Sequence, residues 1–292
     1  MEVYRPSSLP EALEMRAAHP DAVPMAGGTD LMVEINFGRR HPEAILDVSH
    51  LSELKAVRRE EGRVVLGAGV SYARAIRELP DHAALVQASR TVGSPQIRNR
   101  GTVGGNLGTA SPAGDALPVL AVYDAEIVVA SEGGTRRIPW HQFLTGPKRN
   151  ALAPDELIVA AEWAAPDGPG SFSKVGTRNA MVISIAGLSL QVDTAGRRLR
   201  IALGSVGPTI LRAPEAEAFG AGALDESGAW TDPHATVPDA ALARFGELTA
   251  AAARPIDDVR GTAAYRRHAC AVLARRALTW ALDDRRATTS QA

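Results

Sequence analysis

The chain lacks the residue types that several classes of functional site require. Its only cysteine among 292 residues is Cys270, which excludes an intrachain disulfide framework, a cysteine-ligated iron–sulfur cluster and a cysteine-based zinc site within the chain. Cys270 is expected to be a small buried hydrophobic residue. The seven histidines show no metal-ligand spacing. No metal site is therefore expected, and no residue of the chain is predicted to be catalytic.

Neither charge nor hydropathy points to a nucleic acid or a membrane. The 32 basic and 33 acidic side chains nearly cancel, so no excess of positive charge favours nucleic acid or an anionic lipid surface. No apolar run reaches the roughly 18 residues of a membrane span. The start of the chain, residues 1–6, has no apolar segment, so no signal peptide and a cytoplasmic location are expected. A hydrophobic content of 45% and a charged content of 22% are typical of a globular protein.

Glycine, by contrast, is concentrated in one long segment. Residues 101–115 contain five glycines, two threonines, a serine and an asparagine, with no charge before Asp115. Glycine is unfavourable in helices and in core strands, so the composition predicts a loop whose backbone N–H groups approach a ligand. Phosphate or pyrophosphate is the usual ligand of such a loop.

A shorter patch of the same kind, Ala26-Gly27-Gly28-Thr29-Asp30, lies upstream. By itself it is equally compatible with a tight turn that leads into a helix capped by Thr29 or Asp30. Similarly, residues 101–115 alone could be a flexible surface loop. The two patches together favour one large, phosphate-bearing cofactor that is held at two points.

Residues 67–72, Gly-Ala-Gly-Val-Ser-Tyr, invite comparison with a dinucleotide-binding fingerprint. Tyr72 stands where that fingerprint needs its third glycine for close helix–strand packing. A simple strand-to-helix turn is therefore favoured. Neither glycine patch is followed by Lys-Ser or Lys-Thr, which excludes a P-loop.

Hydrophobic periodicity predicts alternating short helices and strands up to a Pro/Gly-rich boundary at residues 166–170. Helices are expected over residues 8–19 with Ser8 as N-cap, from about residue 31, and over 72–79 and 83–90. Strands are expected over residues 22–25, 44–48, 63–70 and 125–130. Beyond the boundary, three consecutive strands over 172–176, 183–192 and 199–206 predict an antiparallel sheet. Residues 220–238 are expected to be an irregular connection, and residues 240–283 to be helical. The fold class is α+β.

In sequence the chain resembles the flavin subunit of the molybdenum hydroxylases, the xanthine dehydrogenase family, which includes the medium subunit of carbon monoxide dehydrogenase. Ala26 to Asp30 and Thr102-Val103-Gly104-Gly105-Asn106 look like its two FAD-binding loops. Further segments are similar in order and spacing, namely residues 93–100, 110–115, 152–158, 172–174 and 255–266. The resemblance covers the chain from about residue 3 to about residue 283.

The resemblance implies FAD as the cofactor and assigns its contacts. Main-chain groups of Ala26, Gly27, Gly28, Thr29 and Asp30 would wrap the pyrophosphate. Thr102, Val103, Gly104, Gly105 and Asn106 would form the second wall, with hydrogen bonds from the side chains of Thr102 and Asn106. Asp115 would lie near the adenosine, Ile158 would contact the cofactor, and Lys174 would approach the flavin ring. A solvated strand lysine is the alternative for Lys174.

The implied fold is the vanillyl-alcohol-oxidase-like, PCMH-type FAD-binding module. Its two subdomains would span residues 1–56 and 57–170, and a C-terminal α+β domain with a three-stranded antiparallel sheet would span residues 171–292, disordered after about residue 284. The chain departs from many members in lacking an acidic residue near Met181. That departure leaves the flavin environment and the electron acceptor open.

The implied function is electron transfer in a complex. A large subunit would carry molybdopterin, a small subunit would carry two [2Fe–2S] clusters, and FAD on this chain would pass electrons to NAD, oxygen or a quinone. The assembly would be a dimer of heterotrimers. The arginines at 266, 267, 275 and 276 would be a solvated basic face or a docking surface for an acidic partner subunit. The alternatives are a stand-alone FAD oxidase of the same fold and a chain that keeps the fold without flavin.

Overall fold

The contacts of the chain divide it into two compact units. The structure is a computed structural model that describes residues 1–289. The first unit consists of Met1–Glu78, Val92–Ser111 and Asp124–Ala165, and the second consists of Leu79–Thr91, Pro112–Tyr123 and the chain from Pro166 onward. The division of the chain into domains after residues 56 and 170, expected from the sequence, remains a prediction. The contacts add that residues 79–91 and 112–123 belong with the C-terminal unit.

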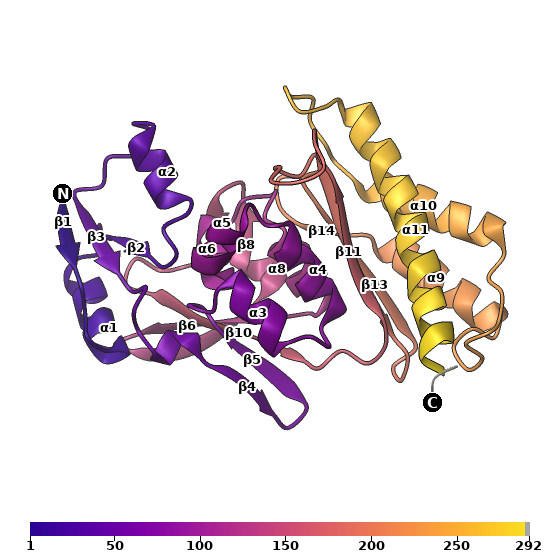
Figure 1. Cartoon of the computed structure of the whole chain (residues 1–292), viewed down its shortest axis with the longest axis horizontal. Helices are drawn as coiled ribbons and strands as arrows, with labels where there is room; N and C mark the ends of the chain where they lie inside the picture. Colours follow the sequence, from indigo (N-terminus) through magenta and orange to yellow (C-terminus); the bar gives the residue numbers. More distant parts are fainter. Residues whose placement is uncertain (290–292) are drawn as a thin grey trace. The chain divides into compact units, whose positions relative to one another are not determined.

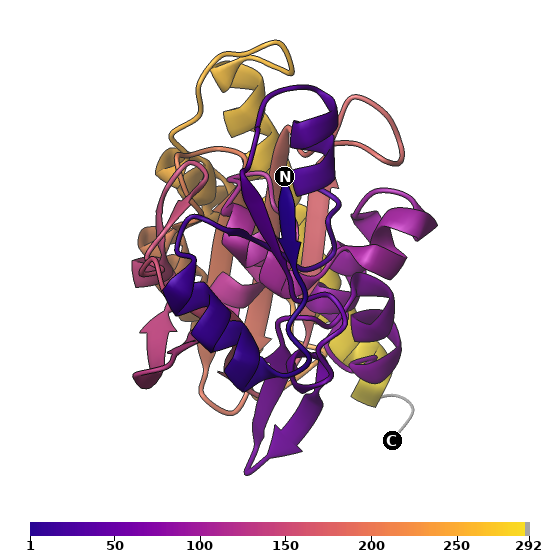
Figure 2. The same ribbon diagram turned by 90° about the vertical axis from the view of Figure 1, so that its left-hand side faces the viewer.

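The first unit begins with a small parallel sheet, which Figure 2 turns toward the viewer. Its strands follow the order β1–β3–β2, and helix α1 contributes Ala12 to their core beside Leu46 and Leu51. As predicted, Ser8 caps α1, since its hydroxyl accepts a hydrogen bond from the N–H of Glu11 at 3.3 Å. The elements here are β1 (Glu2–Tyr4), α1 (Leu9–Ala18), β2 (Val23–Met25), α2 (Leu31–Asn36), β3 (Ala44–Asp47) and the 3-10 turn η1 (Glu53–Lys55).

The rest of the first unit is built on an antiparallel sheet of five strands in the order β4–β5–β10–β6–β7. Strand β10 carries a bulge between Ile158 and Ala160, which redirects the side chains on either side of it. The strands are β4 (Val57–Glu60), β5 (Arg63–Gly67), β6 (Glu126–Ser131), β7 (Gly134–Pro139) and β10 (Leu157–Ala164), with the hairpin β8 (Leu144–Gly146) and β9 (Arg149–Asn150). The helices are α3 (Tyr72–Glu78), α5 (Pro95–Arg100), α6 (Val103–Thr109) and α8 (Trp140–Phe143).

Residues 101–115 are not the continuous loop that their composition predicts, because residues 103–109 form helix α6. Three glycines in seven residues cost such a helix about 3 kcal/mol relative to alanine. Burial of Val103 and Leu107 contributes about 3–6 kcal/mol, and the Thr102 hydroxyl caps the helix by accepting from the N–H of Gly105 at 2.9 Å. Tertiary packing therefore outweighs the local preference of glycine.

The second unit has three layers around the antiparallel sheet β11–β12–β13–β14 (Figure 1). Leu188, Leu190 and Val192 of β12 share a core with the C-terminal helices. On the opposite face the sheet meets α4 and α7: the N–H of Phe172 donates to Gln87, and a Cβ on Gly204 would lie 3.0 Å from Pro118. The elements are α4 (Ala83–Thr91), α7 (Ala116–Val122), β11 (Gly170–Val175), β12 (Ala186–Asp193), β13 (Arg198–Gly204), β14 (Leu211–Arg212), α9 (Pro214–Glu226), α10 (Asp239–Ala252) and α11 (Ala263–Thr289).

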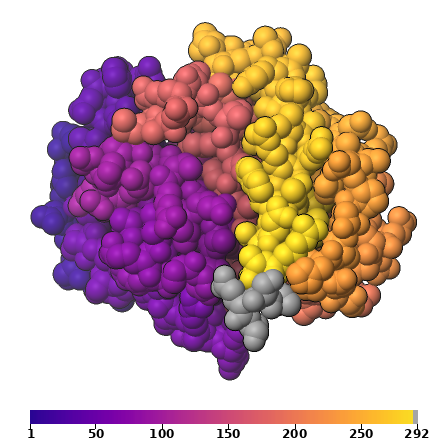
Figure 3. Space-filling view, turned by 45° about the vertical axis from the view of Figure 1, so that its right-hand side comes forward, coloured from indigo at the N-terminus to yellow at the C-terminus, as the bar shows by residue number. Residues whose placement is uncertain are grey.

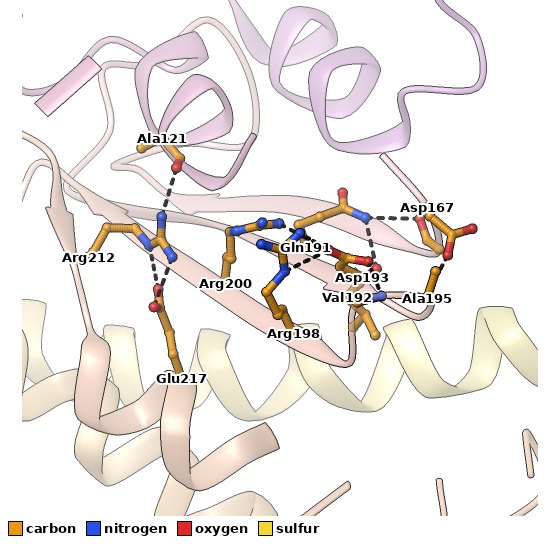
Figure 4. A network of polar contacts seen from close by, with 12 residues as sticks. Ala121, Asp167, Gln191, Val192, Asp193, Ala195, Arg198, Arg200, Arg212 and Glu217 are labelled. Carbon is orange, nitrogen blue, oxygen red and sulfur yellow. Dashed lines mark hydrogen bonds and ion pairs between the residues drawn. The ribbon is translucent and has the colours of Figure 1, made fainter. Parts of the chain in front are cut away.

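Arg212 of β14 connects these layers through an ion pair and a hydrogen bond, as Figure 4 shows. The Arg212 guanidinium forms a two-pronged ion pair with Glu217 of α9, and it also donates to the carbonyl of Ala121 in α7 at 3.0 Å. One short strand is thereby tied to a helix on each side of the sheet.

Two predictions for the C-terminal part need correction. Residues 220–226, expected to belong to an irregular connection over 220–238, instead complete α9, because Gly220 lets the helix approach Leu199 and Phe245 more closely than any side chain would allow. Residues 227–238 form the connection to α10, as expected. Helix α11, which runs along the surface in Figure 3, continues through Thr289 instead of becoming disordered after about residue 284. Its last turns are held by Arg285 and Arg286, which donate to carbonyls of residues 229–235. Residues 290–292 lie outside the described residues.

Candidate functional site

A cavity of about 640 Å³ lies entirely within the first unit. Four segments far apart in the sequence form its walls: the Ala26–Leu31 loop, the turn at Ala68 and Gly69 after β5, the helix α6, and the start of β10. Of the predicted site residues, Ala26, Asp30, Gly104, Gly105 and Ile158 line it. The structure thus brings both glycine patches to one cavity.

The first glycine patch has the features of an anion site. Within residues 1–289, the N–H groups of Gly27, Gly28, Thr29 and Asp30 donate to no protein acceptor. Gly28 has a φ of +73°, and successive N–H groups around such a left-handed residue form an anion-binding concavity. Four free donors in sequence, in a loop whose Ala26 and Asp30 line the cavity, are suited to a pyrophosphate.

The second glycine patch contributes differently from the sequence-based expectation. Its N–H groups are already used, since Val103 donates to Val70, Gly104 to Ala68 and Gly105 to the Thr102 hydroxyl. These groups form a wall of the cavity and not a row of free donors. A Cβ on Gly104 would lie 2.5 Å from the Ala68 carbonyl, whereas one on Gly105 would meet only the Thr102 hydroxyl, at 3.1 Å. Gly104 is therefore needed for packing, and Gly105 keeps the cavity open.

The remaining predicted residues of this patch occupy distinct surroundings. Val103 is buried in the core. The Asn106 side-chain oxygen is buried without a hydrogen-bond partner among the described residues, so it could accept a hydrogen bond from a ligand. Ile158 reaches the cavity at the bulge of β10, and its Cδ1 lies 3.8 Å from the position of a Cβ on Gly108.

Several parts of the cavity could not be assigned from the sequence, and two of them carry chemistry or a backbone signal. The turn Ala68–Gly69 lines it, although the Gly67-Ala-Gly69 pattern was interpreted as a turn without a ligand. The signal was present, because a glycine pair directly after a buried strand indicates close approach of the backbone. Arg16 of α1, which also lines the cavity, has no sequence signal beyond its charge.

Arg16 is a buried arginine on the cavity wall, 9% exposed. One terminal nitrogen donates to the carbonyls of Pro20 and Ala22 at 2.9 and 2.6 Å. Its Nε–H is buried and has no acceptor in the described part of the chain. Burial lowers the pKa of the guanidinium, while Asp155 and Asp21 oppose that shift. A buried, charged donor without a partner is costly, and a bound acceptor would satisfy it.

Asp115 and Lys174 belong to the second unit, where they contact each other. Lys174 Nζ lies 2.6 Å from Asp115 Oδ2, and the two side chains are 9% and 7% exposed. Lys174 also donates to the carbonyls of Thr91 and Val182, each at 3.1 Å, so it is not a solvated lysine. Burial raises the pKa of Asp115, and Lys174 counteracts this shift. As one ion pair, the two residues cannot serve opposite ends of an extended FAD as predicted.

Two family models match successive parts of the chain. The model described as the FAD binding domain in molybdopterin dehydrogenase matches residues 1–162, and the model for the CO dehydrogenase flavoprotein C-terminal domain matches residues 172–281. The chain belongs to the flavoproteins of the molybdopterin dehydrogenases. The predicted resemblance and the FAD cofactor are confirmed, and such a flavoprotein is an oxidoreductase subunit.

Individual relatives of this flavoprotein agree with that result. The nicotinate dehydrogenase FAD-subunit of Eubacterium barkeri is 38% identical over 208 residues, 67% of this chain and 70% of that protein. The caffeine dehydrogenase subunit beta of a Pseudomonas species is 34% identical over 221 residues, 72% and 75% of the two chains. A chain of the carbon monoxide dehydrogenase of Hydrogenophaga pseudoflava superposes with a TM-score of 0.85 at 27% identity, covering 98% of both chains. The α+β, PCMH-type fold is confirmed.

The cavity of this flavoprotein fits FAD. Its walls include Ala26 and Asp30 of the loop whose four N–H groups have no acceptor among residues 1–289, Arg16 with an Nε–H that has no acceptor there either, and the apolar side chains of Val23, Leu54 and Leu157. Elsewhere, no helix in the described part of the chain is long and apolar enough to cross a membrane. Cys270 is buried, as predicted, and burial raises its pKa to about 12.

The substitution Gly105→Val is expected to abolish retention of FAD, because its side chain would project from a cavity wall that has no room for both the side chain and cofactor. The measurement is the flavin absorbance of the protein after gel filtration. Gly222→Val is the matched control, since Gly222 is a helical glycine with nothing within 4 Å of its Cβ position. Flavin retained by Gly105→Val would show that the second glycine patch is misassigned.

The substitution Arg16→Lys keeps the charge and a donor for the Pro20 and Ala22 carbonyls but removes the Nε–H. The Kd for FAD is expected to rise about tenfold, measured by titrating the apoprotein while following flavin fluorescence. Arg254→Lys is the control, because Arg254 caps α10 through carbonyls of Ala251 and Ala253 outside the cavity. An unchanged Kd in Arg16→Lys would show that the Arg16 Nε–H does not bind FAD.

The substitution Lys174→Met is expected to destabilise the chain by about 3 kcal/mol at neutral pH, because it leaves the Asp115 carboxylate buried without its cation. The loss should shrink toward pH 4, since a carboxyl with a raised pKa binds its proton more tightly when folded, and stability then increases as pH falls. Urea denaturation measures both effects. The exposed pair Arg197–Asp225 gives the control Arg197→Met, expected within about 0.5 kcal/mol. Equal losses in the two variants would contradict a structural role for Lys174.

Proposed function

We propose that this chain is the FAD-carrying electron-transfer subunit of a molybdenum hydroxylase complex. Substrate would be oxidised at molybdopterin on a large partner subunit, and [2Fe–2S] clusters on a small partner subunit would pass the electrons to FAD on this chain. The external acceptor would be NAD, oxygen or a quinone. The complex would be a cytoplasmic dimer of heterotrimers.

The observation that carries this proposal is the pairing of the two family domains with a cavity of about 640 Å³ that both glycine patches line. When bound, FAD supplies an isoalloxazine ring that accepts and releases electrons. The residues of this chain would hold it: the N–H groups of Gly27 to Asp30 would bind the pyrophosphate, and Arg16 would donate to a further acceptor of the cofactor. Gly105 and Gly108 would leave room for it beside Ile158.

The side chains around the cavity support a holding role. Among the described lining residues there is no histidine or cysteine, the types that often act as bases or tether flavins. The lining carboxylates of Glu34 and Glu156 are ion-paired with Lys148 and Arg136, at 2.6 Å each. Substrate chemistry on a partner subunit accounts for this composition.

Redox titration of the isolated chain and of its complex is expected to distinguish a subunit of a molybdenum hydroxylase from a stand-alone FAD oxidase. The chain alone should bind FAD and be reduced by dithionite, but not by a small organic substrate. The complex purified through a tag on this chain should contain molybdenum and iron. Its flavin absorbance at about 450 nm should bleach anaerobically with a substrate of the large subunit. Reduction of the isolated chain by an organic substrate would instead identify a stand-alone oxidase.

A further inference from the structure

Two polar links join opposite walls of the FAD cavity at its solvent-exposed edge. Thr109 Oγ1, at the end of α6, donates to Asp30 Oδ2 at 2.9 Å. Lys148 Nζ, from the turn between β8 and β9, donates to Glu34 Oε1 at 2.6 Å. All four residues line the cavity. The Asp30 link holds the N-terminal end of α2 to the opposite wall, and the Glu34 link holds the middle of α2 to it.

The α2 side of these links has little other support. Helix α2 has six residues, of which Leu31 alone is buried, and helices this short are not stable by themselves. Met32, Val33 and Phe37 are 39%, 47% and 72% exposed. Figure 1 shows α2 away from the strands β2 and β3 that flank it in the sequence. The position of α2 therefore depends heavily on its polar contacts.

The opposite side is firmly anchored. The N–H of Lys148 donates to the carbonyl of Ala110 at 3.0 Å, and the side-chain amide of Asn150 donates to the carbonyl of Gly108 at 2.9 Å. Both acceptors lie at the C-terminal end of α6. The hairpin β8–β9 thus presents Lys148 from a fixed base, so that breaking the links would release α2 and not the hairpin.

The Glu34–Lys148 link is an ion pair at neutral pH. The hydrogen bond from Lys148 lowers the pKa of Glu34, and the nearby cations Arg40 and Arg39 lower it further. Arg40 lies 3.8 Å from the other carboxylate oxygen of Glu34. The Lys148 side chain is 63% exposed, so salt in the solvent weakens this attraction.

We propose that the pairs Asp30–Thr109 and Glu34–Lys148 form a clasp that closes α2 over bound FAD and sets the rates at which FAD enters and leaves. The inference rests on the proposed placement of FAD in this cavity. Glu34 and Lys148 act as positioning residues, since they hold α2 and are not required to touch the cofactor.

The test is the rate at which FAD leaves the full-length chain after dilution, followed by the rise in free-flavin fluorescence. Lys148→Met keeps the aliphatic length and removes the charge, and it should speed release by about 2- to 5-fold, the size expected of an exposed ion pair. Lys148→Arg should restore the wild-type rate. Arg63→Met breaks the comparable Arg63–Glu126 pair, which lies outside this cavity. This control should leave the rate of FAD release unchanged.

Two further comparisons distinguish a clasp from a general loss of stability. Added NaCl should speed FAD release from the wild type and have little effect on Lys148→Met, because only the wild type has the pair to screen. Thr109→Val breaks the other link, and the double variant Thr109→Val, Lys148→Met should release FAD faster than either single variant.

The outcomes separate the clasp from the function on which it rests. A double variant that releases FAD at the wild-type rate, or a release rate that Lys148→Arg does not restore, would overturn the clasp while leaving FAD binding intact. A wild-type chain that binds no FAD would instead overturn the proposed function.

Discussion

The cavity depends on a few places where two backbones touch because glycine has no side chain. Gly104 places α6 against Ala68 at the end of β5, and Gly27 places the first glycine patch against the carbonyl of Arg100. A Cβ at either position would collide with a backbone atom, and neither neighbour could move without shifting a whole element. These approaches bring the loop, the turn and the helix together as walls of one cavity. The loop that carries the free donors of residues 27–30 borders the cavity, at Ala26 and Asp30, because of that convergence.

The same constraint explains how the two glycine patches divide their roles. The N–H groups of α6 are consumed in packing against Val70 and Ala68 and in the Thr102 cap, so the helix supplies shape. The N–H groups of Gly27 to Asp30 donate to no acceptor in the described part of the chain, so this loop supplies donors. A cofactor with a pyrophosphate needs both an open wall and an unpaired row of N–H groups. The chain provides each from a different segment.

Local chemistry explains which features could be predicted from the sequence. The Ser8 cap, the antiparallel strands beyond residue 170 and the glycine patches all follow from short-range patterns, and the structure has each of them. Helix α6 was missed because its stability comes from burying Val103 and Leu107, which no propensity scale contains. The pairing of Asp115 with Lys174 joins residues 59 positions apart, and the orphaned Nε–H of Arg16 depends on how α1 packs. Such long-range relations have no local signature.

Two kinds of contact surround the cavity, and they should control different properties of cofactor binding. The backbone approaches at Gly27 and Gly104 have no freedom to adjust, so a change there removes the site altogether. The pairs at Asp30 and Glu34 join exposed side chains worth little individually, so a change there alters rates by small factors and leaves the walls in place. The packed backbone and the Arg16 donor would thus set the affinity for FAD, and the lifetime of the complex would be tuned separately at α2. In the electron-transfer role proposed above, that separation would let the retention of FAD change without any change in the cavity walls.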